Sequence, residues 1–215
     1  MLNPSDLLLY LCTDRALLNG RSLACAVEEA IDGGVTMVQL REKSATSREF
    51  YELALEIGKI TRRRGVPLVI DDRLDIALAS GADGLHIGQS DIPLAAARAL
   101  LGGERFIGVS AGTPAEAVAA ERGGADYLGV GAVYPTTSKD GVGDAIGLLG
   151  LGAVMDSVSI PVVAIGGVGE RNADAVMGAG VAGIAVISAI LAKEDVGAAA
   201  RALKGIVSRR REPRR

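Results

Sequence analysis

One group of polar and charged residues in this 215-residue sequence has the chemistry to bind a phosphorylated compound. Gln39, Arg41 and Lys43 alternate along an extended segment, so their side chains point to the same side. Arg can hold a phosphate through two parallel hydrogen bonds, and Lys adds a compact positive charge. The pattern therefore favours a diphosphate site. A solvated strand end, with Glu42 as ion-pair partner, fits these residues equally well.

A second group has the chemistry to bind Mg²⁺. Asp72 and Asp91 each follow a short apolar run, and carboxylates on neighbouring strand ends can share a hard cation. Mg²⁺ takes one or two protein carboxylates and completes its octahedron with water and substrate phosphate oxygens. The alternative is that the two residues cap helices beginning near Arg73 and Pro93. His86 is the only histidine in the sequence, and it is either a packed residue or part of this site.

Hydroxyl and glycine residues in the second half of the sequence are candidates for binding a further anion. They lie in three places, each after an apolar run: Ser110; the loop Pro135–Gly141, with Thr136, Ser138 and Lys139; and the segments that contain Gly166, Gly167, Ile187 and Ser188. Glycines there let the backbone approach a phosphate closely. Neither a dinucleotide-binding GxGxxG that opens a βαβ unit nor a GxxxxGK[ST] P-loop occurs.

Eight apolar runs are the predicted strands that carry these residues: 7–14, 37–42, 67–72, 84–89, 106–111, 127–134, 161–168 and 183–190. They are continuously apolar, which is typical of parallel strands buried on both faces. Segments with helical spacing separate them, with Ser47 and Thr113 as expected N-caps and Gly65 and Gly123 as expected C-caps. The sequence therefore predicts an α/β fold, a single-domain (βα)8 TIM barrel over residues 1–207, with an open doubly wound sheet as the alternative. Barrels of this kind carry their chemistry at the carboxyl ends of the strands.

Composition narrows the classes of partner. Residues 209–215 hold five Arg and one Glu, a charge of +4, so the net charge of −3 leaves about −7 for the rest of the chain. An acidic body without Trp does not favour nucleic acid, and we expect residues 208–215 to form a basic, disordered tail without a role. The apolar runs are too short for a membrane span. Two cysteines without metal-ligand spacing indicate a reduced, cytoplasmic protein, and the oligomeric state stays open.

Several segments in combination resemble the thiamine phosphate synthase family. The resemblance covers essentially the whole chain, and its most specific parts are YLCTD (10–14), QLREK (39–43), HIGQSD (86–91), PTTSK (135–139), VVAIGGV (162–168) and GIAVISAI (183–190). It implies a transferase that joins hydroxymethylpyrimidine diphosphate to hydroxyethylthiazole phosphate, or its carboxylated form, and yields thiamine phosphate and pyrophosphate. It also implies Mg²⁺ as cofactor and a dissociative reaction, in which a pyrimidine carbocation is captured by the thiazole nitrogen.

The resemblance also implies a role for each matching residue. Gln39 and His86 would flank the pyrimidine, and Asp72 and Asp91 would hold Mg²⁺. The diphosphate and the departing pyrophosphate would be bound by the catalytic residues Arg41, Lys43, Ser110 and Lys139. The thiazole phosphate would be bound by Thr136, Ser138, Gly167, Ile187 and Ser188.

Asp71 departs from the family pattern, which generally has Asn at this substrate-binding position. An amide donates a hydrogen bond to a diphosphate, and an ionised carboxylate does not. One hypothesis is that Asp71 is an additional metal ligand; unchanged Mg²⁺ dependence in Asp71→Asn would argue against it. Two other functions stay open: a thiazole tautomerase on the same barrel, and a catalytically idle phosphate-binding barrel, for which Asp71 would be the indication. Pyrophosphate release from both substrates distinguishes the three.

Overall fold

The computed structural model describes residues 2–136 and 144–211, and their strands form one closed parallel barrel. The strands are β1 (Leu9–Cys12), β2 (Met37–Leu40), β3 (Leu68–Asp71), β4 (Gly84–Ile87), β5 (Phe106–Ala111), β6 (Tyr127–Val130), β7 (Val162–Ile165) and β8 (Gly183–Val186). The helices are η1 (Arg15–Leu18), α1 (Leu23–Asp32), α2 (Ser47–Arg64), α3 (Leu74–Ser80), α4 (Leu94–Leu101), α5 (Pro114–Arg122), α6 (Gly147–Met155), α7 (Ala173–Gly178), α8 (Ser188–Leu191) and α9 (Val196–Arg211).

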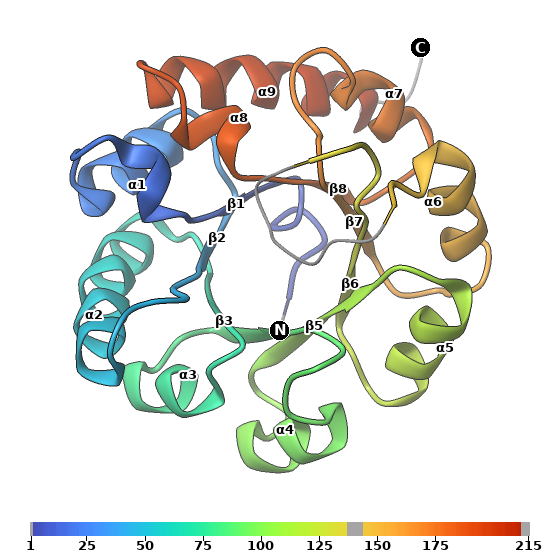
Figure 1. Cartoon of the computed structure of the whole chain (residues 1–215), viewed down its shortest axis with the longest axis horizontal. Helices are drawn as coiled ribbons and strands as arrows, with labels where there is room; N and C mark the ends of the chain where they lie inside the picture. The colour runs from blue at the N-terminus through green and yellow to red at the C-terminus, as the bar shows by residue number, and fades with distance from the viewer. Residues whose placement is uncertain (1, 137–143, 212–215) are drawn as a thin grey trace.

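The strands follow chain order around the barrel, and β8 pairs with β1 to close it (Figure 1). Every neighbouring pair is parallel, as the continuously apolar runs predict, so the expected TIM barrel is confirmed and the open sheet is excluded. The helices lie outside the ring of strands (Figure 1). Most strands are shorter than the predicted apolar runs, because some of the apolar residues at the ends of those runs lie in loops or, after β8, in helix α8.

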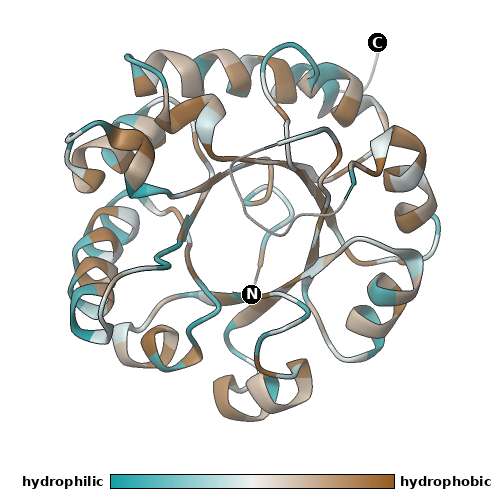
Figure 2. Ribbon diagram, in the orientation of Figure 1, coloured by the Kyte–Doolittle hydropathy of each residue, from teal (hydrophilic) through white to brown (hydrophobic). Residues whose placement is uncertain are grey.

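Two apolar layers hold the barrel together. Alternate residues of each strand face outward against the helices, as Leu9 and Leu11 of β1 do, or inward, as Tyr10 and Cys12 do. The inner cluster is small: Leu7, Tyr10, Cys12, Met37, Val69, Phe106, Tyr127, Val163 and Ala185. Figure 2 shows the strands coloured mainly as apolar and many of the loops as polar. Polar side chains therefore gather at the strand ends, above a thin apolar floor.

Capping residues set the beginnings and ends of several helices. Thr113 caps α5 in a capping box with Glu116, and Gly65 and Gly123 are C-caps, as predicted. The predicted N-cap Ser47 is wrong. Thr46 takes that position in α2 and forms a capping box with Glu49, because its hydroxyl reaches the Glu49 N–H.

Helix α9 continues through residues 208–211, which the sequence analysis assigned to the tail. The other residues of that tail, 212–215, lie outside the described residues. In the described parts of the chain, every helix is too short or too polar to cross a lipid bilayer.

Candidate active site

A pocket of about 1620 Å³ lies at the carboxyl ends of the strands. All the predicted site residues that the structure describes line it: Gln39, Arg41, Lys43, Asp71, Asp72, His86, Asp91, Ser110, Thr136, Gly166, Gly167, Ile187 and Ser188. Ser138 and Lys139 lie outside the described residues. The parallel barrel explains this convergence, because it brings all the strand ends to one rim.

Cations after β2 face carboxylates at the end of β3, the neighbouring strand. Lys43 Nζ lies 3.3 Å from an oxygen of Asp71 and also pairs closely with Asp72. Arg41 Nε lies 3.7 Å from Asp71, and a terminal nitrogen of Arg41 lies 3.6 Å from Asp14. Partial burial lowers the pKa of Lys43, but the two aspartates outweigh it and raise that pKa overall. Lys43 therefore stays protonated inside the pocket.

Asp72 and Asp91 form a pair of carboxylates beside Lys43. Burial raises the pKa of Asp91, the hydrogen bond from the Gly88 N–H at 2.7 Å lowers it, and the neighbouring Asp72 carboxylate raises it again. The net direction of the Asp91 pKa is upward; burial is the largest cause, and the neighbouring acid adds to it. Asp72 also adopts a left-handed backbone with φ of 61°. Two converging carboxylates are a donor set that suits Mg²⁺.

Asp71 does not join this pair to make a larger acidic cluster. Among the described residues, no group of three or more His, Cys, Asp or Glu side chains is placed to hold a metal ion. The Asp71 carboxylate faces the cations Arg41 and Lys43, and Asp72 pairs with Lys43 as well. Asp71 as an additional metal ligand therefore stays a prediction.

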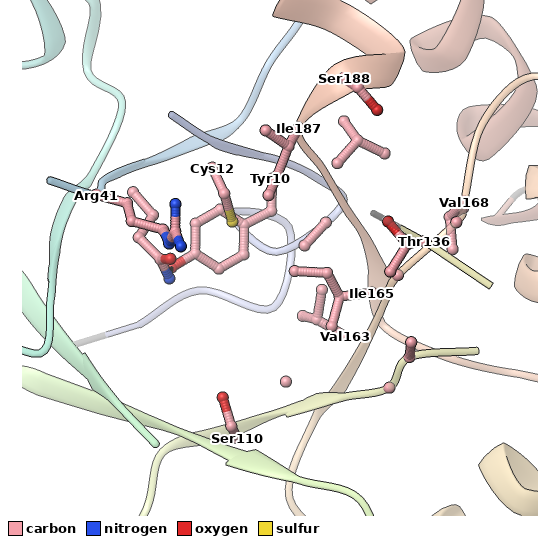
Figure 3. Close-up of a pocket in the computed structure, with 18 of the residues that line it drawn as sticks. Tyr10, Cys12, Arg41, Ser110, Thr136, Val163, Ile165, Val168, Ile187 and Ser188 are labelled. Carbon is pink, nitrogen blue, oxygen red and sulfur yellow. Dashed lines mark hydrogen bonds between the residues drawn. The ribbon is translucent and has the colours of Figure 1, made fainter. Parts of the chain in front are cut away.

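The opposite side of the pocket is formed by the loops after β6, β7 and β8. Figure 3 shows Arg41 and Tyr10 on one side of the pocket, and Thr136, Val168 and Ser188 on the other. Gly167 has φ of 64°, and a Cβ there would lie 2.7 Å from the carbonyl oxygen of Pro135. The loop after β7 thus needs glycine at this position. Loops after strands seven and eight, with a short extra helix such as α8, commonly bind phosphate in barrels of this type.

The comparisons with known proteins agree with this geometry. A family model described as thiamine monophosphate synthase matches residues 9–190. The chain therefore belongs to the thiamine monophosphate synthase family. A thiamine-phosphate synthase of Clostridium novyi is 52% identical over 92% of this chain and 97% of its own length. One of Chloroflexus aurantiacus is 53% identical over 94% of each chain. The solved thiamine phosphate pyrophosphorylase of Pyrococcus furiosus is 42% identical, with a TM-score of 0.90 over 97% of this chain and 99% of its own.

This member of the thiamine monophosphate synthase family also contains two tyrosines, in and below the pocket, that the sequence analysis missed. Tyr10 lies on the pocket floor, and Tyr127 lies fully buried below it. Their hydroxyls are 2.9 Å apart and join Gln39 to His86. The sequence alone suggests packed strand residues at both positions. The signal that could have revealed more is a phenol hydroxyl in mainly aliphatic strands, because a buried hydroxyl needs a hydrogen-bond partner.

Proposed function

We propose that this protein is a thiamine-phosphate synthase. It joins hydroxymethylpyrimidine diphosphate to hydroxyethylthiazole phosphate, or its carboxylated form, and releases pyrophosphate. The observation that carries the proposal is the convergence of cations and a carboxylate pair on one side of a single pocket, opposite a glycine-containing phosphate loop. The names and high identity of the relatives support the same activity.

Mg²⁺ is the proposed cofactor, held by Asp72 and Asp91. Among the described residues the pocket lining holds four cationic and five acidic side chains: Arg41, Lys43, Arg171 and Lys193 against Asp71, Asp72, Asp91, Glu116 and Glu170. These side chains alone do not neutralise a bound diphosphate, so a divalent cation fits the charge of the site. When bound, Mg²⁺ supplies positive charge to the diphosphate oxygens.

Arg41 and Lys43 are proposed to bind the diphosphate and to stabilise the pyrophosphate as it leaves. Both are already held at the rim by Asp71, Asp72 and Asp14, so their positions are set before the substrate enters. Negative charge grows on the leaving group as its bond to carbon breaks, and preorganised cations there stabilise the transition state more than the substrate. Ser110 and Lys139 are proposed to complete this group.

The two rings are proposed to meet between the two anion sites. Gln39 and His86 flank the pyrimidine from β2 and β4, where both side chains are buried and hydrogen-bonded. The thiazole phosphate is assigned to Thr136, Ser138, Gly167, Ile187 and Ser188. A dissociative reaction then needs no nucleophile from the protein, because the thiazole nitrogen captures the pyrimidine carbocation.

The proposed partners are small molecules, not nucleic acid or membrane. Neither Cys12, which is buried, nor Cys25, which is exposed, forms a disulfide. Reduced cysteines fit a reducing compartment, so we propose a cytoplasmic location.

Pyrophosphate release, measured with both substrates and a titration of Mg²⁺, tests this function. A thiamine-phosphate synthase releases pyrophosphate only when both substrates are present and Mg²⁺ is supplied. A thiazole tautomerase would convert its thiazole substrate without releasing pyrophosphate, and a binding barrel would turn over neither compound. Either of those results would refute the proposal.

A further inference from the structure

Five polar side chains form a continuous hydrogen-bonded chain across the barrel, beneath and beside the pocket. Gln39 Nε2 donates to Tyr10 Oη at 2.8 Å, and Tyr10 Oη lies 2.9 Å from Tyr127 Oη. Tyr127 Oη lies 3.0 Å from His86 Nδ1, and His86 Nε2 lies 2.9 Å from Ser110 Oγ. The chain thus connects β2, β1, β6, β4 and β5, and it ends at a hydroxyl that lines the pocket.

If each phenol both accepts and donates within the chain, the first hydrogen bond sets the direction of the others. Gln39 donates an N–H to Tyr10, and in this arrangement Tyr10 gives its own hydrogen to Tyr127. Tyr127 then gives its hydrogen to His86 Nδ1. In the same arrangement a neutral imidazole carries its one N–H on Nε2 and donates it to Ser110 Oγ, 2.9 Å away. The Ser110 hydroxyl then keeps its own hydrogen for another acceptor, and Ser110 lines the pocket.

Burial keeps both phenols in the neutral form that this chain requires. Desolvation raises the pKa of Tyr10 well above its ordinary value, and it raises the pKa of Tyr127 as well. Neither phenol loses its proton at neutral pH, so each is always a donor as well as an acceptor. Both phenols can therefore accept and donate at the same time, as the proposed direction of the chain requires.

Glycines on the neighbouring strands make room for the rings of this chain. A Cβ on Gly108 of β5 would overlap the ring and hydroxyl of Tyr127, closer than the 3.0 Å that real Cβ atoms keep. A Cβ on Gly129 of β6 would lie 3.0 Å from His86 Cε1. Phe106 packs edge-on against Tyr127, with ring centroids 6.3 Å apart. The Tyr127 hydroxyl is thus fixed in place by packing on several sides.

We propose that Tyr127 is a positioning residue that holds His86 in the Nε2–H tautomer and thereby directs the Ser110 hydroxyl hydrogen to an oxygen of the bound diphosphate. Tyr127 has 0% of its surface exposed, so it acts through His86 rather than through the substrate. A hydroxyl that is already turned toward the leaving group stabilises the developing charge without reorganising. The assignment of a diphosphate oxygen as the acceptor rests on the proposed function, whereas the tautomer of His86 does not depend on it.

The tautomer can be read directly, because His86 is the only histidine in the chain. In protein labelled with ¹⁵N-histidine and free of substrate, long-range ¹H–¹⁵N spectra distinguish the protonated ring nitrogen from the bare one. We expect Nε2–H alone in the wild type and in Tyr10→Phe, where Tyr127 still donates to His86. We expect both tautomers in Tyr127→Phe, because Nδ1 has lost its donor. An Nδ1–H wild type, or an unchanged tautomer in Tyr127→Phe, would overturn the proposal.

A double-mutant cycle tests whether Tyr127 acts through Ser110. We expect Tyr127→Phe to lower kcat for pyrophosphate release about tenfold, the effect of one lost hydrogen bond in the transition state. In a Ser110→Ala background the same change should have little further effect on kcat. An equal loss in both backgrounds would indicate a merely structural role and would refute the proposal. Tyr51→Phe, at a 36% exposed position on α2, is the control for the chemical change alone.

The two experiments separate failure of this proposal from failure of the proposed function. A wild-type protein that releases no pyrophosphate from both substrates with Mg²⁺ refutes the proposed function, and the tautomer spectra still decide whether Tyr127 positions His86. An active wild type whose His86 tautomer is indifferent to Tyr127 leaves the function in place and refutes the positioning role.

Discussion

Replacing Gly108 by alanine should destabilise the barrel by several kcal/mol, although it adds one methyl group. The new Cβ would overlap the ring of Tyr127, which is buried against Tyr10, Phe106 and His86 and cannot move freely. Moving the ring away would break the hydrogen bonds of 2.9 and 3.0 Å that its hydroxyl makes. Two lost hydrogen bonds at about 0.5–1.5 kcal/mol each, with overpacking at about 1–3 kcal/mol, give a loss of roughly 2–6 kcal/mol.

Urea unfolding measures this loss, and Gly152→Ala is the matched control. Gly152 lies inside helix α6, and nothing approaches within 4 Å of a Cβ placed on it. The same substitution there should raise the free energy of unfolding by about 0.5–1 kcal/mol, since alanine favours helix. In a Tyr127→Phe background, Gly108→Ala should cost less, because the hydrogen bonds are already gone. The reasoning fails if Gly108→Ala is as mild as Gly152→Ala, or costs the same in both backgrounds.

Three further predictions concern the site and the pH dependence of stability. Asp91→Asn should raise the Mg²⁺ concentration that gives half-maximal pyrophosphate release roughly tenfold or more, because one of the two proposed charged ligands is lost. An unchanged Mg²⁺ titration would contradict the proposal that Asp72 and Asp91 hold the ion. Arg41→Ala should lower kcat/KM by roughly 10²–10³, and steady-state kinetics that remain near wild type would remove Arg41 from the diphosphate site. The Ser159 N–H donates to a carboxylate oxygen of Glu121 at 2.7 Å and holds the pKa of Glu121 below its ordinary value of 4.5. The ionised Glu121 therefore stabilises the fold above pH 4.5. This stabilisation is lost as the pH falls through the lowered pKa. Unfolding curves against pH should therefore show Glu121→Gln destabilised at neutral pH, with the difference closing in acid; a constant difference would contradict this sign.

The order of strands could be predicted from the sequence because buried parallel strands are apolar on both faces. The ends of the strands could not. The predicted strand 183–190 is β8 only as far as Val186, and α8 begins at Ser188. Ile190 is fully buried in that helix. Apolarity reports burial, and a short apolar run does not distinguish a strand from a buried helix.

The placement of the candidate site was predictable where alternation decides it. Gln39, Arg41 and Lys43 all line the pocket, as two-residue spacing along β2 and its extension requires. The orientation of Asp71 toward the cations was not predictable, because it depends on how β2 and β3 are aligned in space. The link through Tyr127 depends in the same way on contacts between strands that are distant in the sequence.

Asp72 adopts a left-handed backbone in the loop after β3. Residues other than glycine reach that conformation at a cost of about 1 kcal/mol, although aspartate tolerates it better than most. The loop after β3 therefore stores conformational energy at the residue whose carboxylate opposes Asp91. The main chain at Asp72 thus helps to set the direction from which its carboxylate approaches Asp91.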